Sequence, residues 1–300
     1  MLKIAFHPSY EHPLKKGHRF PMEKYDLLPK QLMHEGTCTD ENFFEPEKAK
    51  DEDVLRVHTL EYLDKLKTLS LSKSEIRVTG FSLSQELVNR ELIITQGTID
   101  ASLFALEFGI AMNIAGGTHH SYSTHGEAFC LLNDQAIAAK YLLHYEYVSK
   151  ILIVDLDVHQ GNGTAEIFKS NRNVFTFSMH GEENYPFNKE DSDLDIGLPN
   201  NTGDNEYLSI LYNTLPNLIS QEKPDFIYYL SGVDILQTDK LGKLNCSLDG
   251  CKKRDEFVLN LCRTHKIPIM CSMGGGYSPD IKVIIEAHAN TFRIAAELIE

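Results

Sequence analysis

A segment in the middle of the sequence, ILIVDLDVHQGNG, carries three polar side chains at a spacing that suits a metal site. Asp155, Asp157 and His159 stand two residues apart, and a β-strand places alternate side chains on one face. The apolar residues before them are typical of a buried strand, and open α/β sheets bind ligands at the carboxyl ends of their strands. We therefore predict a divalent metal site here; the alternative is a strand that simply ends in a polar loop.

Two other apolar runs end in residues that belong to the same chemistry. Residues 226–230 are followed shortly by Asp234, a candidate third metal ligand. Residues 110–115 are followed by two glycines, which let the backbone turn tightly, and then by His119 and His120. If these runs are parallel strands of one sheet, their carboxyl ends bring the carboxylate and the two imidazoles to the same edge.

A fourth apolar run, residues 267–273, leads into three glycines and then Tyr277. Four predicted strands therefore deliver carboxylates, imidazoles and one phenol to the same edge of a sheet. Chance is the poorer explanation for this convergence, although a single tyrosine after a strand is an ordinary core or surface residue in most proteins.

A metal ion bound by Asp157, His159 and Asp234 would have an O, N, O ligand set, which suits zinc or another divalent first-row ion. Three protein ligands leave positions open for water and substrate. Such an ion lowers the pKa of a bound water molecule and polarises a substrate carbonyl. The ligand set therefore predicts hydrolysis by a metal-activated water.

The remaining polar residues supply the other parts of such a reaction. His119 and His120 fit the roles of general base and general acid, which histidines perform near neutral pH. Tyr277 could donate a hydrogen bond to the developing oxyanion opposite the metal. Asp155, on the same strand face as Asp157, is better placed to orient a histidine than to act as a fourth ligand.

The elements that must position these residues alternate along the chain. Strand-length apolar runs are separated by helical segments such as 204–220, with leucines at helical spacing, and 279–299, where Ser278 is the expected N-cap and Pro279 the first helical residue. This alternation predicts one domain over residues 1–300, with three α/β/α layers and a mostly parallel central sheet. The expected strands are residues 2–6, 110–115, 151–154, 174–178, 226–230 and 267–273.

Composition limits the class of partner. The formal net charge is -14, which argues against nucleic acid and is compatible with cationic ligands such as lysine-rich tails or polyamines. The sequence has no apolar run long enough to span a membrane and no secretory signal, so we expect a cytoplasmic protein that does not bind membranes. Its six cysteines are scattered and are expected to be reduced, packed thiols.

Several motifs together resemble one known family. The segments GGTHHSYS, AFCLLND, DLDVHQGNGT, SGVD and GGGY look like the active-site blocks of the zinc-dependent histone deacetylase superfamily, in the same order. HRFPMEKY and VHTLEYLDKL also resemble family segments, so the likeness spans nearly the whole chain. The run SDLDIGLP is similar to bacterial deacetylase-like amidohydrolases and to the class IV branch.

The resemblance implies the arginase/deacetylase fold and a zinc-dependent lysine deacylase, which hydrolyses the amide of Nε-acyl-lysine in a protein or peptide. It implies one zinc ion on Asp157, His159 and Asp234, with His119, His120 and Tyr277 as catalytic residues. Asp155 and Asn162 would support the two histidines. The resemblance also implies a substrate channel along Phe129, Tyr185 and Gly275, and a structural potassium ion at Asp155, Asp157, His159, Ser178 and Met179.

The sequence departs from the family pattern in three places. Asn162 stands where many class I relatives have an aspartate behind the second histidine, so His120 should be less easily protonated. Ala128 replaces a glycine next to the channel. The aspartate with which several relatives hold a peptide backbone has no clear counterpart in residues 78–85.

Other functions fit parts of the same pattern. An arginase-type ureohydrolase shares the fold but needs a carboxylate two residues after His159, where this chain has Gly161. A catalytically inactive acyl-lysine binding module would be expected to lack one of the site residues, and a nucleophilic Cys130 or Cys271 has no activating neighbours in the sequence. An acetylpolyamine amidohydrolase and a long-chain fatty-acyl-lysine deacylase stay open as alternatives, and so does the oligomeric state, with a monomer favoured.

Overall fold

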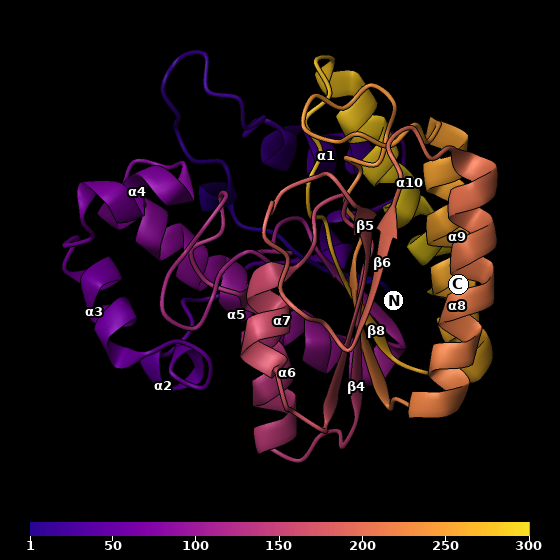
Figure 1. The fold of residues 1–300 in the computed structure, drawn as a ribbon, viewed down its shortest axis with the longest axis horizontal. Helices are drawn as coiled ribbons and strands as arrows, with labels where there is room; N and C mark the ends of the chain where they lie inside the picture. The colour runs from indigo at the N-terminus through magenta and orange to yellow at the C-terminus, as the bar shows by residue number, and fades with distance from the viewer. Residues whose placement is uncertain (300) are drawn as a thin grey trace.

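Eight strands form one parallel sheet in the computed structural model, which describes residues 1–299 (Figure 1). Their order across the sheet is β2-β1-β3-β8-β7-β4-β5-β6, and every neighbouring pair runs in the same direction. The strands are β1 (Lys3–Ala5), β2 (Phe43–Phe44), β3 (Ile110–Asn113), β4 (Ile151–Asp155), β5 (Val174–Gly181), β6 (Leu194–Leu198), β7 (Phe226–Leu230) and β8 (Ile269–Ser272).

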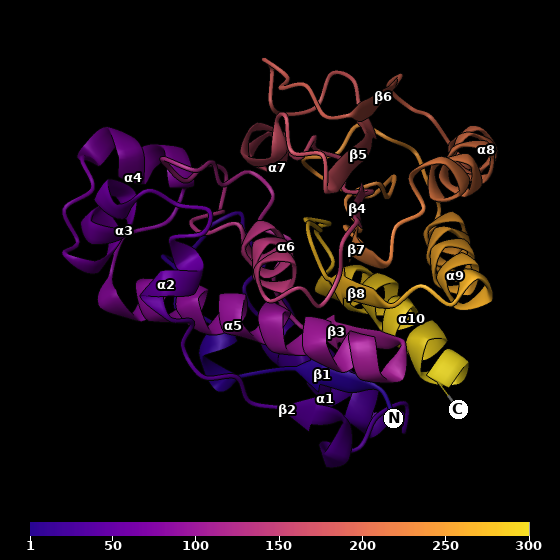
Figure 2. The same cartoon turned by 90° about the horizontal axis from the view of Figure 1, so that it is seen from below.

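Helices cover both faces of the sheet, which gives the three predicted layers (Figure 2). One face carries α5 (Gln85–Phe108), α6 (Asp134–His144) and α7 (Asn162–Phe168), with the short helices α2 (Asp51–Val54), α3 (Leu60–Lys67) and α4 (Lys73–Thr79) outside them. The opposite face carries α8 (Asp204–Glu222), α9 (Leu248–His265) and α10 (Ile281–Ile299), and α1 (Lys24–His34) packs on α10. None of the helices described is both long and apolar enough to cross a membrane.

The four central strands position the chemistry. Every residue of β3, β8, β7 and β4 is buried, because helices lie on both faces, and this explains why the strands are continuous apolar runs in the sequence. These strands are immediate neighbours in the sheet, so their carboxyl ends open at one short stretch of its edge.

All six predicted strands are present, but two further strands lie at the edges of the sheet. β2 has two residues, too few for a periodic signal. β6 alternates between half-buried and exposed residues before its buried last residue and includes Asp195, so its sequence lacks the apolar run of a central strand. Both are edge strands, where one side needs no partner.

The prediction for the last helix was wrong at its start. The leucines predicted for the core side of α8 are buried, but α10 begins at Ile281 instead of Pro279. The carboxylate of Asp280 accepts a hydrogen bond from the backbone N–H of Lys282 (3.0 Å), which is how an N-cap side chain acts. Ser278 instead hydrogen-bonds to the hydroxyl of Thr238 (2.7 Å).

Arg254 of α9 joins the ends of two central strands. Its side chain is fully buried and pairs with Asp255 (2.8 Å). The same guanidinium donates to the carbonyls of Gly232 (2.6 Å) and Leu156 (3.3 Å). It therefore holds together the two loops that follow β4 and β7.

We expect Arg254→Met to destabilise the protein by about 3–5 kcal/mol, because it leaves Asp255 and three carbonyls buried without their cationic partner. Chemical denaturation monitored by circular dichroism measures this loss. The matched control is Lys253→Met, which removes an exposed cation from the same helix and should change stability by less than about 0.5 kcal/mol. Equal stability of the two variants would contradict the role given to Arg254.

Candidate metal-dependent active site

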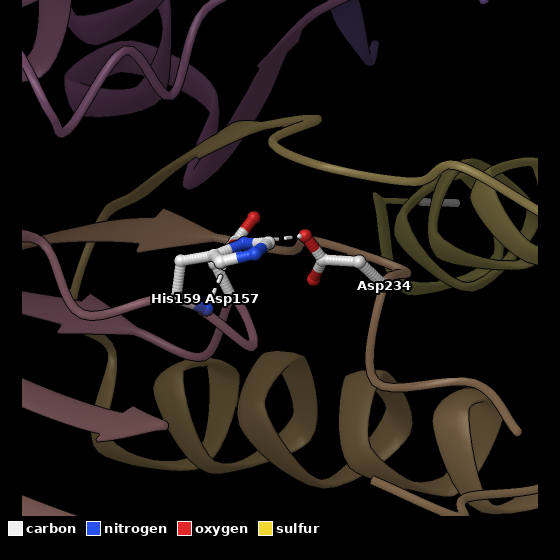
Figure 3. A group of neighbouring side chains, drawn as sticks. All are labelled: Asp157, His159 and Asp234. Atoms are coloured by element: carbon white, nitrogen blue, oxygen red, sulfur yellow. Dashed lines mark hydrogen bonds and ion pairs between the residues drawn. The ribbon is translucent and has the colours of Figure 1, made fainter. Parts of the chain in front are cut away.

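Three predicted ligands lie together at the carboxyl edge of the sheet (Figure 3). Asp157 and His159 follow β4, and Asp234 follows β7, the neighbouring strand. One ligand atom from each lies within 4.8 Å of the others, and all three residues are buried. Nδ1 of His159 is 3.0 Å from Asp157 Oδ1 and 3.1 Å from Asp234 Oδ2.

Backbone N–H groups fix the two carboxylates. Val158 donates to Asp234 Oδ1 (2.9 Å), and Gly275, in the turn after β8, donates to Asp157 Oδ2 (2.8 Å). The geometry also explains why residue 275 is a glycine, because a Cβ at this position would collide with the carboxylate of Asp234. The ligand cluster is therefore held by three neighbouring strand ends.

The electrostatics of the cluster favour a cation. Burial, with the charge of Asp157 second, raises the pKa of Asp234 to about 7. Burial alone would lower the pKa of His159, but its hydrogen bonds to the two carboxylates outweigh this and raise it to about 10. Two buried carboxylates thus hold a positive charge between them, and the O, N, O donor set fits a divalent ion in the same place.

The histidine pair lies beside these ligands. The ring centroids of His119 and His120 are 4.1 Å apart, and Nε2 of His119 is 3.9 Å from Asp157 Oδ1. Nδ1 of His119 contacts Asp155 Oδ2 (2.6 Å), and Nδ1 of His120 contacts Asn162 Oδ1 (2.7 Å). In both rings Nδ1 takes part in a hydrogen bond, so Nε2 is the nitrogen that can exchange a proton with a substrate or water.

The two histidines differ in their protonation. Burial lowers the pKa of His119, but the charge and hydrogen bond of Asp155 outweigh it, so the pKa is raised. For His120, burial and the neighbouring histidines lower the pKa well below its usual value. Asp155 and Asn162 therefore support an imidazolium on one side and a neutral imidazole on the other.

Glu127 is a residue that the sequence analysis missed. Its carboxylate accepts a hydrogen bond from the hydroxyl of Tyr185 and lies 3.4 Å from Nδ2 of Asn162. The same amide nitrogen donates to the hydroxyl of Tyr122 (3.1 Å). These contacts orient the Asn162 amide so that its oxygen faces His120. No motif pointed to Glu127, because its partners come from distant segments.

Tyr277 faces the cluster from the turn after β8. Its ring centroid is 6.4 Å from that of His159, and its backbone N–H donates to Asp239 (2.6 Å). Burial, then the charges of Asp234 and Asp157, raise the pKa of the phenol well above its usual value. The hydroxyl stays protonated and can donate a hydrogen bond.

Two connected spaces lead to these groups. An inner cavity of about 40 Å³ borders two of the metal-ligand residues, Asp157 and His159. Its other lining residues include Phe20, Arg90 and Gly275. A wider entrance cavity of about 530 Å³ is lined on one side by Phe129 and on the other by Tyr185, whose ring meets His120 edge to face at 5.0 Å. Ala128 lines both spaces, so its methyl does lie at the channel. The three predicted channel residues thus line the entrance or the inner cavity.

The residues assigned to potassium lie on adjacent strands. Asp155 ends β4 and pairs in register with Ser178 of β5, which is followed by Met179. Asp157 and His159 come directly after β4, so the five residues are neighbours and buried. The carboxylate of Asp155 is already engaged with His119.

Lys24 is a second residue to which the sequence analysis gave no role, although it lies in the segment HRFPMEKY. It is fully buried, and its Nζ donates to the carbonyl of Gly274 (3.0 Å). The rings of Phe20 and Tyr25 lie 5.3 Å from this nitrogen, and that of Tyr277 lies 6.0 Å away. Lys24 therefore holds the glycine turn that carries the active-site tyrosine.

The site does not fit the two alternative chemistries, a two-metal ureohydrolase and a cysteine nucleophile. A side chain at Gly161 would collide with the Asp155 carboxylate, so this position cannot supply ligands for a second metal. Within residues 1–299, Asp157, His159 and Asp234 are the one group of three or more His, Cys, Asp or Glu side chains that could hold a metal ion. Cys130 and Cys271 are free and buried, and burial raises the pKa of both thiols well above the usual value. Neither thiol is activated as a nucleophile.

Comparisons with known proteins point to one family. The histone deacetylase domain model matches residues 18–292. An uncharacterized protein of Picosynechococcus is 41% identical over 295 residues, which are 98% of each chain. Histone deacetylase 2 of Arabidopsis thaliana is 31% identical, over 97% of this chain and 79% of that protein.

Two further matches cover nearly the whole chain. The acetoin utilization protein AcuC of Staphylococcus aureus is 28% identical, over 97% of this chain and 78% of that protein. The crystal structure of the HDA15 HD domain superposes with a TM-score of 0.85 at 20% identity, covering 99% of this chain and 88% of that one. The expected arginase/deacetylase fold is thereby confirmed.

We expect Gly275→Ala to weaken metal binding about 10–100-fold, because the added methyl displaces the Asp234 carboxylate from its position. Metal content after dialysis against a weak chelator measures the effect, with circular dichroism as the check on folding. Gly203→Ala is the matched control, since the nearest atom to a Cβ there is 3.7 Å away. Full metal retention in Gly275→Ala would show that the turn after β8 does not constrain the ligands.

Proposed function

The chain belongs to the histone deacetylase family, and from that premise we propose that it is a zinc-dependent hydrolase that removes a short acyl group from Nε-acyl-lysine. The observation that carries the proposal is the buried cluster of Asp157, His159 and Asp234, of which Asp157 and His159 line one cavity together with a histidine pair and a phenol. Family membership supports deacetylation; the metal, the lysine carrier and the acyl length are parts of the proposal.

Asp157, His159 and Asp234 would hold the zinc ion, which when bound lowers the pKa of water and polarises a carbonyl. His120 has the features of the base. Its Nδ1–H donates to the Asn162 oxygen, so the lone pair on Nε2 is free to take a proton from water. The lowered pKa keeps this imidazole neutral at physiological pH.

His119 and Tyr277 complete the reaction. Because Asp155 outweighs burial and raises its pKa, His119 favours the protonated form, whose Nε2 proton can pass to the leaving amine of lysine. The phenol of Tyr277 can donate a hydrogen bond to the oxygen of the tetrahedral intermediate. Since Lys24 and Asp239 anchor its turn, this donor is held in place before the substrate arrives.

The shape of the two spaces favours a short acyl group on a straight stem. Phe129 and Tyr185 provide an apolar wall for the methylene groups of lysine. The inner cavity of about 40 Å³ has room for only a few atoms, so it suits acetyl and opposes a long fatty chain. A structural potassium ion at Asp155 and Ser178, and a place in the class IV-like branch, belong to the same proposal.

The decisive experiment joins metal analysis with turnover. Purified protein should contain one divalent ion per chain, and chelation should abolish release of acetate from an acetyl-lysine peptide until zinc is restored. A decanoyl-lysine peptide should be cleaved at least about tenfold more slowly, because the inner cavity is small. Two ions per active chain, or hydrolysis without metal, would overturn the proposal.

We expect Tyr277→Phe to lower kcat about 10²–10³-fold with zinc content unchanged, since it removes one donor to the oxyanion. KM should change little, because the ring that packs beside Phe129 remains. Steady-state kinetics with an acetyl-lysine peptide measures both constants. Tyr147→Phe, at an exposed position far from the site, is the control for loss of a hydroxyl.

A further inference from the structure

Basic side chains gather around the entrance cavity, although the whole chain carries a net charge of -14. Arg19 and Lys243 line the entrance itself. Next to it, a groove of about 450 Å³ is lined by Lys15 and Arg77. The sign of the charge at the opening is therefore opposite to that of the molecule.

Arg19 is built into the wall of the channel. Its guanidinium lies 5.0 Å above the ring of Phe129, and the side chain is exposed. Among residues 1–299, no carboxylate comes within 4.0 Å of its nitrogens. Stacking on Phe129 thus holds an unneutralised cation beside the path of the substrate.

Backbone hydrogen bonds connect the helix beside the groove to the segment that carries Phe129. The backbone N–H groups of Ala128 and Phe129 donate to the carbonyls of Val78 (3.0 Å) and Thr79 (2.7 Å), at the end of α4. Arg77 is the residue before them and is exposed. It has no carboxylate within ion-pair distance in the part of the chain described, and the same holds for Lys15.

His18 joins the two spaces. It contacts the carbonyl of Gly80 through Nε2 (2.9 Å), and its ring meets those of Phe81 (5.7 Å) and Phe129 (5.9 Å). It is also the residue before Arg19. The groove and the entrance cavity are lined by successive residues of the chain, His18 and Arg77 in the groove and Arg19 and Val78 in the entrance, so a chain leaving the channel on this side would pass over both.

Acidic groups at the opening are few. Glu183 lines the entrance, but it lies 3.5 Å from Lys243 and accepts a hydrogen bond from Asn200 (2.7 Å). The two charges offset each other. Arg19, Arg77 and Lys15 thus give the opening a positive field.

We propose that this basic surface, Lys15, Arg19 and Arg77, binds an acidic peptide segment next to the acyl-lysine, so that the substrate class is acyl-lysine in an acidic sequence. The inference rests on the proposed function. It also argues against acetylpolyamines and lysine-rich tails, since both bring further positive charge to a positive opening. An acidic flank would replace the missing aspartate as the means of holding the peptide.

The test compares three peptides of equal length with a central acetyl-lysine and acidic, neutral or basic flanks, together with acetylspermidine, on the zinc-loaded enzyme. At low ionic strength, kcat/KM should be about tenfold higher for the acidic than for the neutral peptide, and lowest for the basic peptide and the polyamine. The preference should shrink at about 0.5 M salt, because these side chains are exposed and screened.

The double variant Arg19→Gln/Arg77→Gln should bring the ratio of acidic to neutral peptide close to one. The matched control is Lys252→Gln/Lys253→Gln on α9, which changes the net charge equally at a distant surface and should keep the preference. Equilibrium binding of the same peptides without the acetyl group, followed by fluorescence anisotropy, measures the preference independently of turnover.

The outcomes separate the two proposals. Hydrolysis of all peptides with equal kcat/KM, a preference for basic peptides or acetylspermidine, or an acidic preference that survives in the double variant would each overturn the inference and leave the deacylase intact. Preferential binding of acidic peptides with no hydrolysis of any substrate would overturn the proposed function and leave the basic surface standing.

Discussion

Two carboxylates buried side by side, those of Asp157 and Asp234, are the constraint on which the rest of the site depends. Neither can keep its charge in a protein interior without donors and a cation, and the raised pKa of Asp234 expresses that difficulty. The surrounding residues compensate for the cost of burying these two charges. Backbone N–H groups that follow β4 and β8 donate to the carboxylates, Gly275 leaves room for them, and Arg254 holds together the loops after β4 and β7.

Most of the fold and the reacting groups could be predicted from the sequence, because both depend on local pattern. A parallel strand buried on both faces is a continuous apolar run, and its carboxyl end is where polar residues begin. The strands carrying Asp157, Asp234, the histidine pair and Tyr277 are the four central ones. What failed was at the periphery, where β2 is too short and β6 too polar to give a signal.

Supporting residues were not predictable for a different reason. Glu127, Lys24 and Arg254 act through contacts with residues far away in the sequence, such as Glu127 with Tyr185 and Lys24 with Gly274. Overall composition also says little about the local charge. The net charge of -14 is compatible with cationic ligands, whereas the basic surface proposed at the channel opening depends on a few residues of the 15–19 loop and of α4. A binding surface responds to the nearby field, because distant charges are screened within about 10 Å.

The unequal support of the two histidines gives two neighbouring rings opposite tendencies to be protonated. His119 is paired with a carboxylate and His120 with an amide, and their pKa values move in opposite directions although the rings are 4.1 Å apart. The expected weaker protonation of His120 agrees with this, but its largest cause is burial, which the sequence could not reveal. Glu127 contacts the amide nitrogen of Asn162, and the amide separates it from His120. Its carboxylate therefore orients Asn162 without touching the imidazole. An aspartate at position 162 would raise the pKa of His120 and make the pair alike; the asparagine keeps the ring oriented and neutral, ready to accept a proton.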